Sequence, residues 1–260
     1  MVKRCTGEDE SRLLDFLQND AVYLTFLLAD IGNYGFDQEF QTVYAGMEED
    51  RITHVYLKFY GNLIVAGEAG NIDGEFLRTL TEEWKPDVIM GKAELTKAAG
   101  RWLPGYELAE KNLYLLEDSA HLIGETGLPE GVTMKKGVPG DEDKIHAFLM
   151  TIPEIRALYA SKEMIADRLK SGDGTHLYLE RNGEMIAHVN SAAKSPFTVM
   201  LGGAAVKEKE RGKNLEALLV SRISRDILAE GKKPCLFCDR GEELICSCRS
   251  AFRRPESGER

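Results

Sequence analysis

One stretch, residues 198–239, limits what this chain can fold into more than any other. It opens with an apolar run typical of a buried strand and continues through a charged loop into an amphipathic helix, in which leucines and isoleucines recur at three- and four-residue spacing. Gly231 is placed to cap that helix, and Pro234 prevents its continuation. The predicted elements are a strand at Thr198–Val206, a loop at Lys207–Asn214, a helix at Leu215–Gly231 and a strand at Pro234–Asp239.

The loop in front of the helix is basic. The first turn of a helix offers unpaired backbone N–H groups and the positive end of the helix dipole, and both favour an anion. We therefore expect a phosphate-bearing ligand at this turn. The alternative is a solvated, charged turn before a helix that only packs. The cationic side chains of the loop are Lys207, Lys209, Arg211 and Lys213.

The segment Glu210–Leu219 resembles the pyrophosphate loop of the GNAT superfamily of N-acetyltransferases, and the resemblance extends over roughly residues 132–252. The family pattern is Arg or Gln, two residues, Gly, one residue, then Gly or Ala, ahead of an amphipathic helix. Arg211 and the following Gly-Lys pair match it, whereas Asn214 and Glu216 stand where the motif has small residues. Asn tolerates left-handed backbone geometry well. A carboxylate in the first helical turn competes with a bound diphosphate.

The resemblance implies an α/β chain with a mixed sheet, the acyl-CoA N-acyltransferase-like fold, and acetyl-CoA as co-substrate without a metal. Backbone groups at the end of the first strand would hold the pantetheine arm, and the loop would hold the diphosphate. The reaction implied is direct attack of an amine, on a small molecule or amino acid, on the thioester. The cofactor-binding residues expected on this basis are Ala204, Ala205, Val206, Arg211, Gly212, Lys213, Asn214, Leu215 and Glu216.

His188 is the candidate catalytic residue. It shares one face of a predicted central strand with Asn190, and an imidazole titrates near neutral pH. The alternative is a strand histidine that is bonded to a neighbouring strand or to solvent. The family often has a tyrosine near the C-terminus that protonates the leaving thiolate, but Ser247 stands there and no tyrosine follows Tyr178. Thiolate release would then use water, or the domain is a poor catalyst.

The chain is expected to hold two tandem GNAT-like domains. Residues 1–123 predict a complete α/β unit with strands at Gln41–Met47, Arg51–Tyr60, Asn62–Glu68 and 108–117 and with no catalytic constellation. Residues 124–131 are rich in Gly and Pro and predict a linker. Residues 132–260 restart the pattern as the acetyltransferase-like domain. We expect the first domain to be degenerate and to have lost its coenzyme site.

The composition excludes some classes of partner. The chain has 260 residues, 43% of them hydrophobic and 29% charged, enough for one large or two ordinary domains. Its formal net charge of −10 argues against nucleic acid, and no apolar run approaches the ~20 residues of a membrane span. We expect no nucleic acid and no membrane as partners. Because no signal peptide is recognisable, we expect a cytoplasmic protein. A homodimer is compatible with the sequence.

Four cysteines between Cys235 and Cys248 raise the alternative of a zinc site made of four thiolates. Cys235 and Cys238 lie three apart on a predicted strand and would point to opposite faces, which is wrong for a shared ion. The second pair, Cys246 and Cys248, is separated by one residue where two is usual. We therefore expect no metal, and small buried thiols in the strand.

Two functions from different classes remain. The first is an acetyl-CoA-dependent N-acetyltransferase acting on a small amine. The alternative is a catalytically weak or inactive coenzyme A-binding or regulatory module, which the missing motif glycines and the missing tyrosine favour. A purely structural interaction domain is a third reading. The acidic composition mildly favours a cationic amine as acceptor.

Overall fold

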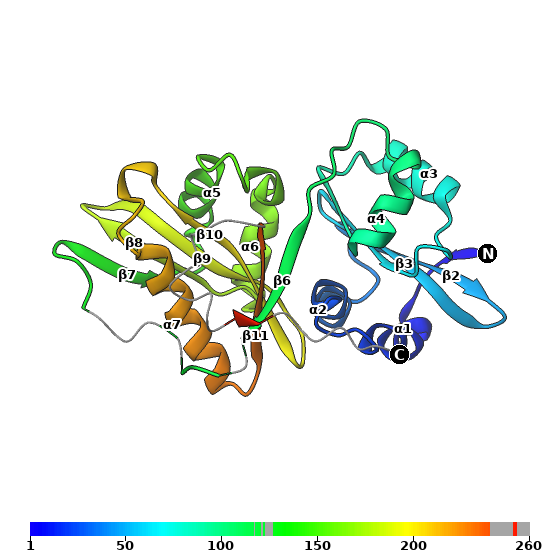
Figure 1. The fold of residues 1–260 in the computed structure, drawn as a ribbon, viewed down its shortest axis with the longest axis horizontal. Coiled ribbons are helices and arrows are strands. Elements are labelled where there is room, and N and C mark those ends of the chain that lie inside the picture. The colour runs from blue at the N-terminus through cyan, green and yellow to red at the C-terminus, as the bar shows by residue number, and fades with distance from the viewer. Residues whose placement is uncertain (117, 121, 123–126, 240–251, 254–260) are drawn as a thin grey trace. The chain divides into compact units, whose positions relative to one another are not determined.

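The computed structural model of the chain describes residues 1–116, 118–120, 122, 127–239 and 252–253. The chain divides into two compact units, residues 1–110 and 111–260. Each unit is built on its own sheet, with five strands in the first and seven in the second (Figure 1). No described helix has both the length and the apolarity needed to cross a membrane.

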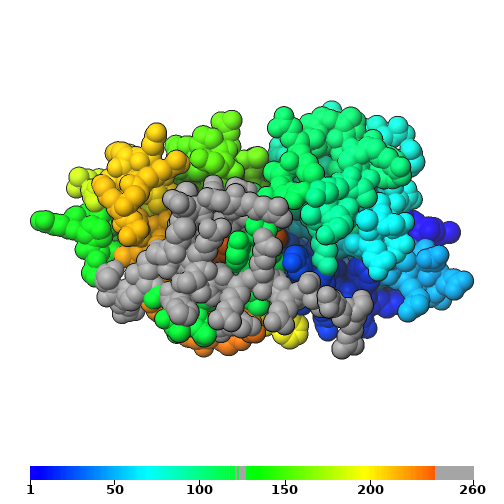
Figure 2. Space-filling view, in the orientation of Figure 1, coloured from blue at the N-terminus to red at the C-terminus, as the bar shows by residue number. Residues whose placement is uncertain are grey.

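The first unit wraps its helices around a sheet in the order β1-β2-β3-β4-β5. All neighbouring strands are antiparallel except β4 and β5, which are parallel. The segment after β4, coloured cyan to green, makes up much of the visible face of this unit (Figure 2). The elements are β1 (Val2–Arg4), η1 (Gly7–Asp9), α1 (Glu10–Gln18), α2 (Thr25–Tyr34), β2 (Gln41–Glu48), β3 (Arg51–Phe59), β4 (Asn62–Gly67), α3 (Gly74–Trp84), β5 (Val88–Met90), α4 (Ala93–Ala99) and η2 (Gly100–Trp102).

The second unit has the strand order β12-β6-β11-β10-β9-β8-β7, in which only β10 and β11 are parallel. Its elements are β6 (Lys111–Leu116), β7 (Val132–Lys136), α5 (Glu142–Met150), η3 (Arg156–Tyr159), α6 (Lys162–Ser171), β8 (His176–Arg181), β9 (Glu184–Lys194), β10 (Thr198–Val206), η4 (Glu208–Glu210), α7 (Leu215–Ala229), β11 (Lys233–Asp239) and β12 (Phe252–Arg253). The strand, loop, helix and strand predicted over residues 198–239 are thus confirmed.

The two units repeat one topology. Each has a strand, two helices, a three-stranded antiparallel meander, a helix, and a strand parallel to the third strand of the meander. The turn between β8 and β9 uses the predicted Asn182-Gly183 pair, with φ angles of 52° and 78° that suit a two-residue hairpin loop. The predicted tandem arrangement of mixed-sheet domains is confirmed.

The boundary between the units differs from the predicted one. The predicted strand 108–117 was assigned to the first domain, but the strand observed there, β6, pairs antiparallel with β11 of the second sheet. Leu113, Leu115 and Leu116 are buried. The division therefore falls after Glu110, before the predicted linker 124–131, of which residues 124–126 lie outside the described part.

The second sheet has α7 on one face and α5 and α6 on the other (Figure 1). Leu177 and Val189 belong to the core cluster that also contains Leu219 of α7. Side chains alternate along a strand, so their neighbours His176 and His188 face the α5 side. That side of the sheet consequently carries buried polar groups, while the α7 side carries the hydrophobic core cluster.

Candidate cofactor site

The strands β10 and β11 pair along only part of their length. The parallel register runs from Thr198 opposite Lys233 to Leu201 opposite Leu236. Beyond it, β10 continues to Val206 paired with β9, whereas β11 continues to Asp239 paired with β6. The two strands therefore stop pairing with each other in their C-terminal halves. The expected pantetheine contacts Ala204, Ala205 and Val206 all lie on this part of β10.

A bulge interrupts β10 at the same place. The register with β9 shifts between Gly202 and Ala205. Gly203 has a φ of +55°, and a Cβ there would lie 2.7 Å from Oδ1 of Asn190 and 3.0 Å from Oη of Tyr159. Only glycine suits this combination of a left-handed backbone and close packing. A bulge turns backbone N–H and C=O groups away from the hydrogen bonds between strands. The peptide groups of β10 therefore change direction where β10 and β11 cease to pair.

The loop between β10 and α7 presents backbone donors at the helix N-terminus. Asn214 is left-handed, with φ 57° and ψ 20°, and Gly212 has φ 79°. The prediction that asparagine can replace a motif glycine conformationally is therefore confirmed. Among the described residues, no acceptor receives the amide N–H groups of Gly212, Lys213, Asn214 and Leu215. Such a run of amides at the start of a long helix can bind an anion.

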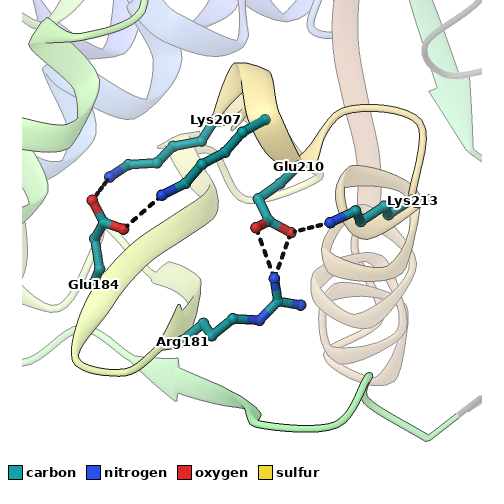
Figure 3. A network of polar contacts seen from close by, with 6 residues as sticks. Arg181, Glu184, Lys207, Glu210 and Lys213 are labelled. Atoms are coloured by element: carbon teal, nitrogen blue, oxygen red, sulfur yellow. Dashed lines mark hydrogen bonds and ion pairs between the residues drawn. The ribbon is translucent and has the colours of Figure 1, made fainter.

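Every cationic side chain of the loop lies against a carboxylate. Lys207 and Lys209 both contact Glu184, the latter at 3.1 Å (Figure 3). Nζ of Lys213 lies 2.9 Å from Oε2 of Glu210. Glu184 is exposed, and surface pairs such as those it makes contribute little net stability and exchange partners easily. The cations are thus held in place around the turn yet remain available to a stronger anion.

Two other ion pairs connect this loop to distant segments. Arg211 lies 3.5 Å from Glu154, in the segment between α5 and η3. Nη1 of Arg181, at the end of β8, donates to both carboxylate oxygens of Glu210 at 2.7 and 2.9 Å (Figure 3). The Lys213 ammonium, with a further contribution from Arg181, holds the pKa of Glu210 below its ordinary value. Glu216 lies in the first turn of α7, as expected from the sequence.

His188 is fully buried, and both of its ring nitrogens are engaged. Nδ1 lies 2.8 Å from the carbonyl oxygen of Gly203, and Nε2 lies 2.8 Å from Nδ1 of His176. The carbonyl can only accept, so the His188 proton is on Nδ1, and Nε2 accepts from His176. Burial lowers the pKa of His188 to about 4. This bonding matches the alternative of a histidine bonded to a neighbouring strand. A role as general base stays a prediction, which this bonding disfavours.

Two buried residues near His188 and Asn190 were not predicted from the sequence. The hydroxyl of Tyr159 donates to Oδ1 of Asn190 at 2.8 Å, and burial raises the pKa of that tyrosine. His176, whose pKa burial lowers well below its ordinary value, is bonded to His188. Tyr159 comes from η3 and His176 from β8. No local spacing links them to the bulge, so only the fold could reveal them.

Several predicted features lie outside the described residues. These are Ser247 and the pair Cys246 and Cys248. Cys235 is described and is buried in β11, with its thiol 3.6 Å from the carbonyl oxygen of Val199. Within the described part of the chain, no group of three or more His, Cys, Asp or Glu side chains could hold a metal ion.

In the first unit, two side chains lie at the N-terminus of α3, the helix that corresponds to α7. The parallel register of β4 and β5 ends at Ile64 opposite Met90, and β4 runs on to Gly67. The Asp73 carboxylate caps α3 by accepting from the amide of Phe76 at 3.0 Å. The Trp102 ring lies against Gly74, where an added Cβ would come within 2.1 Å of it. The expected loss of the coenzyme site in the first unit stays a prediction.

The topology defines a class of protein. A meander, a helix and a strand parallel to the last strand of the meander make up the GNAT fold, and each unit of this chain has this topology. No protein-family model matches the sequence, and no curated protein sequence does.

Solved structures share this fold over nearly the whole chain. A tandem GNAT protein from the clavulanic acid biosynthesis pathway, solved without AcCoA, is 12% identical with a TM-score of 0.59, over 98% of this chain and 95% of that one. A GCN5-related N-acetyltransferase-like protein from Streptococcus suis is 12% identical with a TM-score of 0.62, over 96% of each chain. A GNAT-family acetyltransferase from Colwellia psychrerythraea is 11% identical with a TM-score of 0.53, over 97% and 96%. At such identities the likeness shows the fold.

Proposed function

We propose that the second unit binds acetyl-CoA and transfers its acetyl group to the amine of a small molecule or amino acid. The observation that carries this proposal is the end of β10–β11 pairing at Leu201 and Leu236, beside a bulge and one loop away from unpaired amides at the start of α7. An extended thioester-bearing arm with a diphosphate at its far end has the chemistry that such a site can bind.

The diphosphate is assigned to the loop before α7. The amides of Gly212, Lys213, Asn214 and Leu215 would donate to its oxygens, and the loop cations would exchange their carboxylate partners for phosphate. Glu184 and Glu210 hold those cations nearby before the ligand arrives. The pantetheine arm is assigned to β10 from Ala204 to Val206, where the strand no longer pairs with β11.

The chemistry needs few side chains. The amine nitrogen attacks the thioester carbonyl carbon, the new C–N bond forms, the C–S bond breaks, and the electron pair leaves with the coenzyme A thiolate. The amine loses a proton to water, and the thiolate takes one from water. The protein contributes proximity and a backbone donor for the thioester oxygen. A named general base is therefore not required for turnover.

A coenzyme A-binding module without turnover is the second candidate. The specific observations that favour it are the carboxylate of Glu216 in the first turn of α7 and the carboxylate partners of all four loop cations. Both weaken diphosphate binding relative to an all-cationic loop. This module would bind the same ligand in the same place, so the two candidates differ in turnover and share the site.

Two measurements test these proposals. Acetyl-CoA should raise the thermal unfolding midpoint, because a ligand bound only by the folded state stabilises it. Acetyl-pantetheine, which lacks the diphosphate, should raise it far less. Equal shifts with both ligands would contradict the placement of the diphosphate. Thioester consumption with a panel of cationic and neutral amines then separates the transferase from the module, since the module binds acetyl-CoA without consuming it.

A further inference from the structure

The Gly203–Ala204 peptide is held from one side by a buried histidine. The carbonyl oxygen of Gly203 accepts from Nδ1 of His188 at 2.8 Å, so this carbonyl is directed at a side chain. A peptide unit is planar and trans, so the N–H of Ala204 points in the opposite direction from that carbonyl. Fixing the oxygen therefore fixes the direction of the Ala204 amide.

A second histidine determines the proton arrangement. His176 donates from Nδ1 to Nε2 of His188 at 2.8 Å, which keeps the His188 proton on Nδ1, facing Gly203. Nε2 of His176 is buried and has no partner among the described residues, as a nitrogen without a proton in a neutral ring allows. The Arg168 guanidinium, 3.1 Å from Asp173, lies near enough to oppose protonation of His176.

Close packing prevents the peptide from turning over. The Oη of Tyr159 and Oδ1 of Asn190 are bonded to each other at 2.8 Å and lie against the bulge, where a Cβ on Gly202 would be 2.7 Å from Oη. On the same side, the ring of Phe148 packs beside His188. Ala204 itself is only partly buried. The bulge is thus anchored on the α5 side, and its partly exposed residue lies on the stretch of β10 that β11 leaves unpaired.

We propose that His188 is a positioning residue, which holds the Gly203 carbonyl and thereby aims the Ala204 N–H at the acyl-bearing end of the bound thioester. This inference rests on the proposed function and assigns the protein's polarising donor to one backbone amide. In this role His188 orients the Gly203–Ala204 peptide and transfers no proton to or from the substrate. His176 supports it by fixing the tautomer.

The sequence offers a direct probe of this peptide. Gly203-Ala204 is the only Gly-Ala pair in the chain. Labelling glycine with ¹³C at the carbonyl and alanine with ¹⁵N therefore gives one carbonyl-amide correlation in an NMR spectrum. His188→Leu removes the donor at similar size, and His188→Asn keeps an N–H donor near the position of Nδ1. Val189→Ala is the matched control, because it removes buried volume on the opposite face of β9.

We expect His188→Leu to move the Gly203–Ala204 correlation in the unliganded protein and to lower kcat for thioester consumption by about tenfold or more, while KM for acetyl-CoA changes by less than roughly twofold. His188→Asn and Val189→Ala should retain both the correlation and most of kcat. An unmoved correlation in His188→Leu, or a kcat equal to that of Val189→Ala, overturns this inference alone. A wild-type chain that neither binds nor consumes acetyl-CoA overturns the proposed function instead.

Discussion

The ammonium group of Lys213 lies 2.9 Å from the carboxylate of Glu210, whose side chain is only 6% exposed. Glu210 also receives two hydrogen bonds from Nη1 of Arg181, so one carboxylate connects the loop before α7 to the end of β8. The loop that carries the proposed diphosphate contacts is therefore shaped before any ligand binds, which lowers the entropy cost of binding.

Replacing Glu210 with Gln should destabilise the second unit. The amide of Gln places an NH₂ group toward Arg181 and Lys213 and leaves these cations without a charged partner. We expect a lower urea midpoint than in the wild type. Glu208→Gln is the control, since Glu208 is exposed on the same short helix. Equal midpoints for the two variants would show that the Glu210 pairs do not hold the loop.

Replacing Glu216 with Ala should strengthen acetyl-CoA binding. A carboxylate in the first turn of α7 repels a diphosphate at the same helix end, and such a charge contributes a few tenths to about 1 kcal/mol. The dissociation constant, measured by calorimetry, should fall about two- to fivefold. Glu208→Ala removes the same charge away from the helix and should have a smaller effect. A weaker affinity in Glu216→Ala would mean that no diphosphate lies at this turn.

Unfolding stability should fall as the pH decreases below neutrality. Burial lowers the pKa of His188 from 6.5 to about 4, so the unfolded chain binds this proton at a higher pH than the folded chain does. The stabilisation is complete above pH 6.5 and is lost as the pH falls from 6.5 towards 4, by up to about 3 kcal/mol for this group. Urea unfolding at several pH values should show that the free energy of unfolding depends less steeply on pH in His188→Asn than in the wild type. His146→Asn, at a partly exposed histidine of α5, should keep the wild-type slope.

The first unit should not contribute a cofactor site. Trp102 lies against Gly74 at the N-terminus of α3, and the Asp73 carboxylate already caps that helix. Calorimetry should therefore give one acetyl-CoA per chain. Gly74→Ala should lower the unfolding free energy by about 1–3 kcal/mol, because the methyl group clashes with the Trp102 ring, and should leave the affinity unchanged. Gly70→Ala, where nothing lies within 4 Å, is the control. Two equivalents of acetyl-CoA bound per chain would contradict this reading.

Local patterns were sufficient to predict many elements. The spacing of apolar residues predicted the helix at 215–229, and the Asn182-Gly183 pair predicted the hairpin turn. Both patterns depend only on residues that are close in the sequence. The tandem plan followed from element order. The loop motif also placed the left-handed Asn214 correctly.

Relationships between distant residues were not predictable. The carboxylate partners of the loop cations come from Glu154, Glu184 and Glu210, and only Glu210 is adjacent in the motif. The contact between His176 and His188 depends on how β8 pairs with β9, which hydrophobic periodicity does not specify at the level of single atoms. The prediction that the strand at 108–117 belongs to the first domain was wrong for the same reason, since the sequence pattern of a strand does not specify its partner strand.

The placement of β6 also decides where this protein can be divided. Because Lys111–Leu116 pairs with β11, a fragment that begins in the Gly- and Pro-rich segment at 124–131 would lack an interior strand of its own sheet. The backbone of β11 would then be an open edge, available to strands of other molecules. To express the two units separately, the chain should be divided before Lys111. If a second-unit fragment that starts later is insoluble, the missing strand β6 explains the insolubility. Such a result would not show that the two units need each other to fold.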